Sequence, residues 1–160
     1  MKGYSLKPNT SPSLFKEAKL DKVIDSYYAD IRDFNSVNTA LTQFNPDILI
    51  HMAAQPLVRY SYNEPIETYQ VNVIGTVNIL EAARNCTNLK AIVNVTSDKC
   101  YLNQELNIRY KEGDSLGGYD PYSSSKACSE LVSAAYRNSF LGINKIGLAT
   151  ARAGNVIGGG

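Results

Sequence analysis

The chain has 160 residues, with sixteen basic and fifteen acidic side chains and a formal net charge of +1. This length is enough for one domain with a hydrophobic core. The near-neutral, mixed charge excludes a basic surface for nucleic acid or for an acidic membrane, and no apolar run reaches the roughly 18 residues of a membrane span. Residues 1–12 lack the apolar region of a signal peptide, so we expect a cytoplasmic protein.

The expected elements alternate between short strands and helices. Apolar runs rich in Ile and Val are separated by amphipathic stretches, which is typical of an α/β protein with a buried parallel sheet. In chain order we expect strand Lys2–Leu6, helix Pro12–Leu20, strand Val23–Ala29, helix Phe34–Phe44, strand Ile48–Met52, helix Pro65–Asn85, strand Ala91–Thr96, helix Pro121–Phe140 and strand Lys145–Ala151. The polar segment Leu102–Tyr119 is expected to be a loop, and a loop of this length usually carries function.

Three of the helix starts are marked by capping residues. Ser11-Pro12 and Asp120-Pro121 each place a side-chain oxygen before a proline at the first helical position. Asp33 marks the helix over Phe34–Phe44, which Asn45-Pro46 closes.

The cysteines and the single histidine limit the possible metal chemistry. Cys86, Cys100 and Cys128 are odd in number and far apart, without a CxxC pair. This favours free thiols in a reducing cytoplasm over disulfides or a zinc site. His51 ends an apolar run, which favours a packed structural histidine over a metal ligand or a member of a triad. We therefore expect no metal site.

A nucleotide-binding α/β domain is expected to begin with a strand and a glycine-rich turn that seats a pyrophosphate on a helix N-terminus. No G-x-G-x-x-G or P-loop follows a strand in this sequence, and no helix follows the terminal Gly158–Gly160. We therefore expect that parts of the domain are missing at both ends of the sequence.

The segment DPYSSSKACSEL carries Tyr122 and Lys126 four residues apart. At this helical spacing both side chains lie on one face, where a lysine ammonium can favour the phenolate that a general base needs. A surface pair on an amphipathic helix is the competing interpretation, and the spacing alone favours it. The position just after the Asp120-Pro121 cap favours a site.

Two strand ends add further candidates. Val95-Thr96-Ser97-Asp98-Lys99 gathers hydroxyl, carboxyl and amine groups where open parallel sheets bind ligands, although an ordinary polar turn fits too. The strand ending at Met52 runs into small residues through Gln55, which permits close approach of a ligand or simply tight packing.

Six stretches of the sequence resemble the extended short-chain dehydrogenase/reductase family and, within it, the CDP-glucose 4,6-dehydratases. They are GYSLKPNTSPSLF, ADIRD, the run from HMAAQPLVR to NILEAAR, VNVTSDKCY, GGYDPYSSSKACSELV and ARAGNVIGGG. YSSSK alone would indicate only the superfamily, whereas TSDKCY with HMAAQPLVR and RAGNVIGGG is much more specific. The resemblance implies a Rossmann-like parallel sheet with flanking helices. Residues 1–160 would form one partial NAD-binding domain, without the first strand or the C-terminal substrate domain.

The resemblance also implies a reaction. NAD would take hydride from C4 of the glucose ring, water would be eliminated across C5 and C6, and hydride would return at C6. Tyr122 would take the C4 hydroxyl proton, Lys126 would lower the tyrosine pKa and bind the nicotinamide ribose, and Ser97 would hold the C4 oxygen. Asp98 would act as acid for the leaving hydroxyl and Lys99 as base near C5. The related dTDP-glucose dehydratases carry Asp-Glu at these two positions, so the division of roles stays open.

Cofactor and substrate residues follow from the same resemblance. Those expected to contact NAD are Asp30, Ile31, Met52, Ala53, Ala54, Gln55, Pro56, Asn72, Thr96, Tyr122, Lys126, Ala153 and Val156. Asn155 would contact the nucleotide sugar with Ser97, and Arg59 would face its phosphates, although a surface role for Arg59 is equally consistent. Full-length relatives pair through the helix that carries the Tyr-Lys motif and the long helix before it, and this resemblance suggests a homodimer.

Two alternatives remain open. A sugar-nucleotide epimerase of the same superfamily would leave Asp98 and Lys99 idle, which the TSDK match argues against. An inactive fragment is the other alternative, because a sheet without its first strand has exposed edges and no glycine turn for the pyrophosphate. We therefore expect the isolated chain to bind NAD weakly or not at all and to turn over no substrate.

Overall fold

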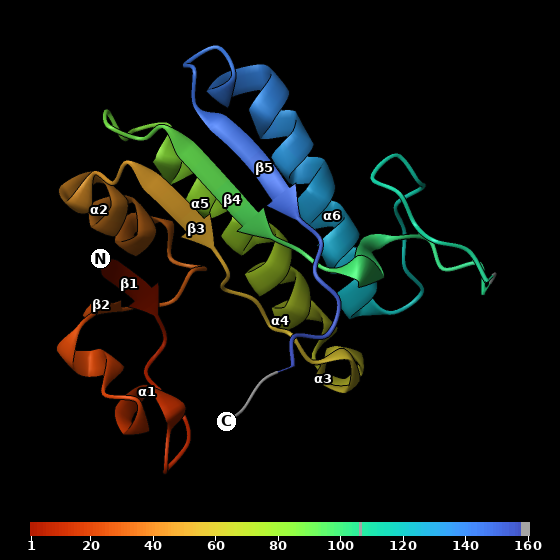
Figure 1. The fold of residues 1–160 in the computed structure, drawn as a ribbon, viewed down its shortest axis with the longest axis horizontal. Helices are drawn as coiled ribbons and strands as arrows, with labels where there is room; N and C mark the ends of the chain where they lie inside the picture. Colours follow the sequence, from red (N-terminus) through yellow and green to blue (C-terminus); the bar gives the residue numbers. More distant parts are fainter. Residues whose placement is uncertain (106, 158–160) are drawn as a thin grey trace.

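The computed structural model describes residues 1–105 and 107–157. Its five described strands form two parallel sheets (Figure 1). The larger sheet has the order β3-β4-β5 and consists of Ile48–His51, Ala91–Val95 and Gly147–Ala151. The smaller sheet pairs β1, Lys2–Ser5, with β2, Asp25–Tyr28. The expected α/β class is confirmed, and each observed strand lies within the range predicted for it.

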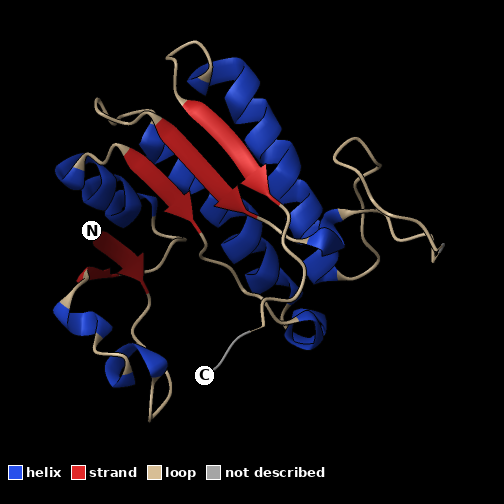
Figure 2. Cartoon of the chain, viewed as in Figure 1, coloured by secondary structure: helices blue, strands red, loops and turns tan. Residues whose placement is uncertain are grey.

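Helices α5 (Gly75–Ala83) and α6 (Pro121–Tyr136) cover one face of the larger sheet (Figure 2). The main apolar cluster lies between these helices and the sheet and includes Leu80, Ile92 and Leu148, all buried. Burial of such side chains is the main stabilising term for a domain of this size.

Helix α2 (Phe34–Phe44) packs against α5 and connects the two sheets. A second buried cluster contains Val37 from α2 and Ile79 from α5, with Ile31 from the loop after β2. Tyr4 of β1 packs against this cluster, and so does Leu49 of β3. The smaller sheet is thus held to the larger one through α2 and not through strand pairing.

Three of the four predicted helices are interrupted or shortened. The Pro12–Leu20 prediction is wrong in extent, because α1 spans only Leu14–Glu17 and a 3₁₀ turn, η1, follows at Leu20–Lys22. The Pro65–Asn85 helix is divided into α4 (Pro65–Tyr69), a π turn η2 (Gln70–Ile74) and α5. Helix α6 likewise ends in a π turn, η4, at Arg137–Leu141.

The remaining helical segments are short. Helix α3 (Val58–Asn63), which the sequence pattern did not predict, precedes α4, and a 3₁₀ turn η3 (Asp98–Cys100) follows β4. The expected loop Leu102–Tyr119 holds no helix or named strand in its described part; one isolated antiparallel bridge joins Tyr101 to Leu116.

The capping predictions were right at two helices. Asp33 accepts hydrogen bonds from the N–H groups of Asn35 and Ser36, and Asp120 accepts one from Ser123 N at 2.9 Å. The prediction of Ser11 as a cap was wrong, because Ser13 caps α1 through the N–H of Lys16.

The cysteines and the helices also bear on the sequence predictions. Cys86, Cys100 and Cys128 are free, and burial raises the pKa of Cys86 and brings that of Cys100 to about 11. Because the thiolate is the reactive form, neither buried thiol is a candidate nucleophile.

None of the described helices is long and apolar enough to cross a membrane.

The core can be tested with a matched pair of leucines. Leu80 is fully buried, and Leu131 is 59% exposed on α6. Leu80→Ala should lower the free energy of unfolding by about 2–5 kcal/mol because it leaves a cavity, whereas Leu131→Ala should change it by less than about 0.5 kcal/mol. Urea unfolding measures both, and equal effects would contradict this description of the core.

Candidate functional site

The candidate site lies at the carboxyl ends of the parallel strands, where the arrowheads of β3, β4 and β5 point in Figure 1. Most of the residues expected at the site follow a strand directly. Asp30 and Ile31 come after β2, Met52–Pro56 after β3, Thr96–Lys99 after β4 and Ala153–Val156 after β5. Open parallel sheets bind ligands at this edge, so the topology brings segments that are distant in sequence to one place.

The segments after β4 and β5 are held together by backbone hydrogen bonds. Thr96 N donates to Ala151 O at 2.9 Å and Asp98 N donates to Ala153 O at 3.0 Å. Ser97 is buried, and its hydroxyl donates to Asp98 Oδ1 at 3.1 Å. The side chains of Asp98 and Lys99 extend from this ordered turn toward solvent, where a substrate can reach them.

Tyr122 and Lys126 lie in the first turns of α6, and both are buried, at 8% and 7% exposure. The surface-pair interpretation is therefore wrong. Helix α6 begins at the Asp120 cap, and Ser61 of α3 accepts a hydrogen bond from Tyr122 N at 3.2 Å. Burial lowers the pKa of Lys126 because desolvation disfavours the ammonium.

The buried carboxylate of Glu130 connects α6 to two strand ends. It accepts a hydrogen bond from Thr96 Oγ1 at 2.5 Å, one from Thr150 Oγ1 at 2.9 Å and one from Arg152 Nη2 at 3.0 Å. Burial acts to raise the pKa of Glu130, but these hydrogen bonds outweigh it and hold the pKa below the ordinary value. Glu130 therefore stays ionised and raises the pKa of Arg152 in turn.

Asn72 braces the segment after β3. Its Oδ1 accepts from Gln55 N at 2.8 Å, and its Nδ2 donates to Gln55 O at 3.1 Å and to Ser125 Oγ at 2.9 Å. The Gln55 side chain in turn donates to Thr68 at 2.9 Å and accepts from Leu57 N at 2.5 Å. Asn72 is 2% exposed, and its hydrogen bonds fix the position of Gln55 relative to α6.

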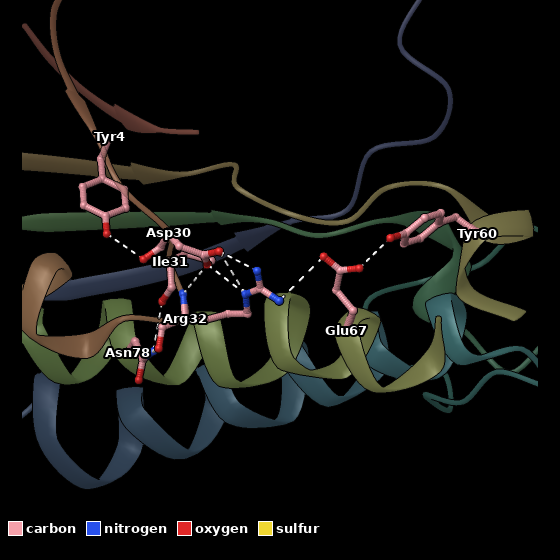
Figure 3. A network of polar contacts seen from close by, with 7 residues as sticks. All are labelled: Tyr4, Asp30, Ile31, Arg32, Tyr60, Glu67 and Asn78. Atoms are coloured by element: carbon pink, nitrogen blue, oxygen red, sulfur yellow. Dashed lines mark hydrogen bonds and ion pairs between the residues drawn. The ribbon is translucent and has the colours of Figure 1, made fainter. Parts of the chain in front are cut away.

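Asp30 belongs to a polar network on the loop after β2 (Figure 3). Arg32 forms a bidentate pair with it, with the closest atoms 2.6 Å apart, and this hydrogen bonding lowers the pKa of Asp30. Arg32 also lies 3.6 Å from Glu67, whose carboxylate accepts from Tyr60 Oη at 2.5 Å. The loop carbonyl of Asp30 accepts from Tyr4 Oη at 2.8 Å. The network fixes an ionised acceptor at this strand end.

A hollow of about 270 Å³ lies beside Asp98 and Lys99. Its other lining residues are Tyr101, Asn103, Tyr110, Gly118, Tyr119, Asp120 and Ser123. Tyr101 and Tyr110 stack with ring centroids 4.7 Å apart. The functional loop expected from the sequence thus borders the catalytic candidates, but none of its individual residues was predicted.

The remaining predicted residues are exposed or structural. Arg59 is exposed on α3, and Asn155 and Val156 are exposed after β5. His51 is buried and hydrogen-bonded to Thr76 at 3.2 Å, as expected for a packed histidine. Among residues 1–105 and 107–157, no group of three or more His, Cys, Asp or Glu side chains is placed to hold a metal ion.

Several contributors to the site were missed by sequence reasoning. Glu130 lies eight residues after Tyr122 on the same helix face, and this spacing was the available signal. Ser61 and Arg152 had no signal, because their contacts depend on α3 and on the path of the chain after β5.

Comparisons with known proteins agree with this fold. The family model described as GDP-mannose 4,6 dehydratase matches residues 5–149. The whole chain is 53% identical to a CDP-glucose 4,6-dehydratase of Salmonella typhimurium and covers 46% of it. A CDP-paratose 2-epimerase of Salmonella typhi is 31% identical over 74% of the chain and 39% of its own length. The chain thus spans about half the length of these curated relatives or less.

Two solved structures show the same Rossmann-like arrangement. The UDP-Glc/GlcNAc 4-epimerase of Campylobacter jejuni matches with a TM-score of 0.80 and 18% identity, over 94% of this chain and 44% of that one. A dTDP-glucose 4,6-dehydratase double mutant of Streptomyces venezuelae, solved with NAD bound, matches with a TM-score of 0.74 and 25% identity, over 86% of this chain and 40% of that one.

His51 gives a pH-dependent prediction. Burial, and next the charge of Lys126, lower its pKa to about 4. In the unfolded chain this histidine has its ordinary pKa of 6.5. Between that pH and about pH 4 the unfolded chain therefore binds a proton that the folded chain does not, so the free energy of unfolding falls as the pH drops. Between about pH 7 and 4.5 the loss should be about 2–3 kcal/mol.

Urea unfolding at the two pH values measures this loss. His51→Gln keeps a polar side chain but cannot titrate. Between pH 7 and 4.5 the free energy of unfolding of this variant should therefore fall by about 2–3 kcal/mol less than that of the unchanged chain. An identical fall in both proteins would contradict the assignment.

Proposed function

Because the chain belongs to the GDP-mannose 4,6-dehydratase family, we propose that it carries the catalytic centre of a sugar-nucleotide 4,6-dehydratase that acts on CDP-glucose. The observation that supports this most directly is the burial of Tyr122 and Lys126 on α6, because the η3 turn that carries Asp98 and Lys99 packs against this helix. The 53% identity to a CDP-glucose 4,6-dehydratase over the whole chain supports the choice of substrate.

The residues of the site fit NAD at the strand ends. When bound, NAD would supply the acceptor for hydride from C4 and return it at C6. Asp30, which Arg32 holds ionised, would accept a hydrogen bond from an adenine amine, and the Ile31 side chain is buried. Met52, Ala53, Ala54, Gln55 and Pro56 form a mostly small-residue segment whose course Asn72 holds. The segments after β4 and β5 would add Thr96, Ala153 and Val156 to this set.

The first step needs a base for the C4 hydroxyl. We assign this to Tyr122, with Lys126 stabilising the phenolate and Ser97 holding the C4 oxygen. Both helix residues are shielded from water, so the lysine charge acts on the phenol in a medium of low dielectric. Thr96 is held by Glu130, which keeps the serine next to it in place.

The elimination step needs an acid and a base that reach the other side of the hexose. Asp98 and Lys99 extend from the η3 turn into the 270 Å³ hollow. Asp98 would protonate the leaving C6 hydroxyl, and Lys99 would take the C5 proton, which is acidic once C4 is a ketone. Asn155 and Arg59 would contact the nucleotide sugar from the segments after β5 and β3.

An epimerase is the second candidate, since a CDP-paratose 2-epimerase is 31% identical over 74% of the chain and a 4-epimerase shares the fold at a TM-score of 0.80. An epimerase needs the tyrosine and lysine but has no use for an acid and base at positions 98 and 99. The presence of Asp98 and Lys99 beside the hollow therefore favours the dehydratase.

The product formed from CDP-glucose distinguishes a dehydratase from an epimerase. We would replace the matched segment of the Salmonella typhimurium CDP-glucose 4,6-dehydratase with residues 1–160 and supply CDP-glucose and NAD. The chimera should form a 4-keto-6-deoxy sugar that absorbs in alkali, and Tyr122→Phe should lower kcat by about 10²–10⁴-fold. Tyr62→Phe, at an exposed tyrosine on α3, is the matched control. An epimer as the sole product would refute the dehydratase proposal.

The roles of Asp98 and Lys99 in elimination can be measured separately from the oxidation at C4. In the same chimera, Lys99→Met should leave C4 oxidation intact but slow elimination by about 10²-fold or more, so reduced cofactor accumulates in a single turnover. Asp98→Asn tests the acid in the same way, and Lys111→Met, at an exposed lysine in the loop, serves as control. Equal loss of oxidation and elimination would contradict these roles.

The isolated chain should behave differently from the chimera. We expect the purified 160-residue chain to bind NAD weakly or not at all and to form no product, because the described strands form two sheets with unpaired facing edges. Equilibrium dialysis with NAD measures this, and tight retention of NAD would contradict it.

A further inference from the structure

Arg152 directly follows β5 and contacts two distant parts of the chain through one guanidinium group. Its Nη2 donates to the buried carboxylate of Glu130 on α6 at 3.0 Å, and its Nη1 donates to the backbone carbonyl of Glu112 at 3.0 Å. The Arg152 side chain is only 16% exposed. A planar guanidinium carries donors at fixed angles on both terminal nitrogens, so it can hold two acceptors at once. Arg152 therefore joins helix α6 to the loop that precedes this helix.

The guanidinium also contacts the aromatic side chains of this loop. Arg152 Cζ lies 4.9 Å from the centroid of the Tyr101 ring, where a cation is attracted to the ring face. The Tyr101 ring stacks on that of Tyr110, with centroids 4.7 Å apart and planes 9° apart. Tyr110 Oη in turn donates to Asn103 Oδ1 at 3.2 Å. A continuous row of contacts thus runs from the end of β5 into the loop.

The described part of the loop is otherwise joined to the domain at its base. Two backbone hydrogen bonds of 2.9 Å close this base, from Leu102 N to Ser115 O and from Gly117 N to Cys100 O. The other hydrogen bonds among the described residues of 103–114 connect loop residues to one another. Figure 1 shows the loop extending away from the three-stranded sheet. The course of the loop beyond its base therefore depends on the guanidinium contacts.

The side chains held in this way line the hollow that the candidate acid and base enter. Tyr101, Asn103 and Tyr110 border the same 270 Å³ space as Asp98 and Lys99. This volume is just below the roughly 300–1,000 Å³ of sites for drug-sized ligands, so the hollow suits a single sugar ring and not a whole nucleotide sugar. A tyrosine offers an apolar ring and a polar hydroxyl, which match the C–H and hydroxyl groups of a hexose.

We propose that Arg152 is a positioning residue that fixes the loop relative to α6, so that the loop side of the hollow keeps the C5–C6 part of the hexose against Asp98 and Lys99. The same guanidinium binds the carboxylate on the helix of Tyr122. One side chain thus sets the spacing between the oxidation and the elimination parts of the site. The identity of the hexose rests on the proposed function, whereas the anchoring of the loop does not.

Hydrogen exchange of the 160-residue chain tests the anchoring without any substrate. Arg152→Lys keeps a positive charge beside Glu130 but cannot bind both acceptors and contact the ring as a planar guanidinium does. Tyr101→Leu removes the ring and leaves the ion pair. Each variant should speed exchange of the hydrogen-bonded loop amides by about tenfold or more, while the amides of β4 change by less than about twofold. The loop amides to follow are those of Leu102, Lys111, Asp114 and Gly117.

The matched control is Arg109→Met, at an exposed arginine of the same loop. This substitution should change exchange of the loop amides by less than about twofold. A residue that only stabilises the whole domain would instead protect β4 and the loop alike. Unchanged loop exchange in both Arg152→Lys and Tyr101→Leu, or an equal rise in β4, would overturn the proposal.

The chimera that carries residues 1–160 measures the effect on the reaction. With CDP-glucose and NAD, Arg152→Lys should slow elimination by about tenfold and leave C4 oxidation within about twofold, because a misplaced hexose loses its alignment with the acid and base. Reduced cofactor should then accumulate in a single turnover. Equal loss of oxidation and elimination would overturn the positioning role. If the unchanged chimera forms no 4-keto product, the proposed function fails, and the exchange result still decides the anchoring of the loop.

Discussion

The arrangement of the candidate site depends on one buried carboxylate. Glu130 accepts hydrogen bonds from Thr96 and Thr150 and pairs with Arg152. These partners lie in or directly after β4 and β5, so the carboxylate fixes the position of α6 along the direction of the strands. Since Tyr122 is two turns earlier on the same helix face, its distance from the ends of the strands is set by the same contact. A buried charge is tolerable only when it is fully paired, which gives the helix one register and not several.

A layer of small polar side chains supports this register. Ser125, Ser129 and Ser133 repeat every four residues on the inner face of α6, and all are at most 2% exposed. Ser129 and Ser133 accept hydrogen bonds from Asn94 of β4, and Ser125 accepts one from Asn72. Small residues let the helix approach the sheet closely, and directional bonds specify its position more exactly than apolar contact does. The serines of the Tyr-Lys segment therefore position the helix as well as make room for a ligand.

Local sequence signals predicted the fold where a single element decided it. Helix Phe34–Phe44 was predicted to the residue, because Asp33 caps it and Asn45 ends it in a left-handed conformation before a proline. Prediction failed where tertiary packing changes a helix: the π turn Gln70–Ile74 divides a segment that reads as one helix. The strand ends of the site followed from topology alone. The contacts of Ser61 and Arg152 with α6 did not, because they join residues 61 and 22 positions apart.

The clearest disagreement between pattern and structure is at β3. Its Ile-Leu-Ile run is typical of a strand buried on both faces, and the prediction of such a strand was correct in position. Yet only Leu49 and His51 face the helices, while Ile48 and Ile50 are largely exposed. The hydrophobic pattern of a strand indicates on how many faces that strand is suited to be buried. The exposed fractions of its side chains show how much of this burial the chain provides. The difference falls on Ile48 and Ile50, so the sequence pattern and the structure independently indicate the same uncovered face of β3.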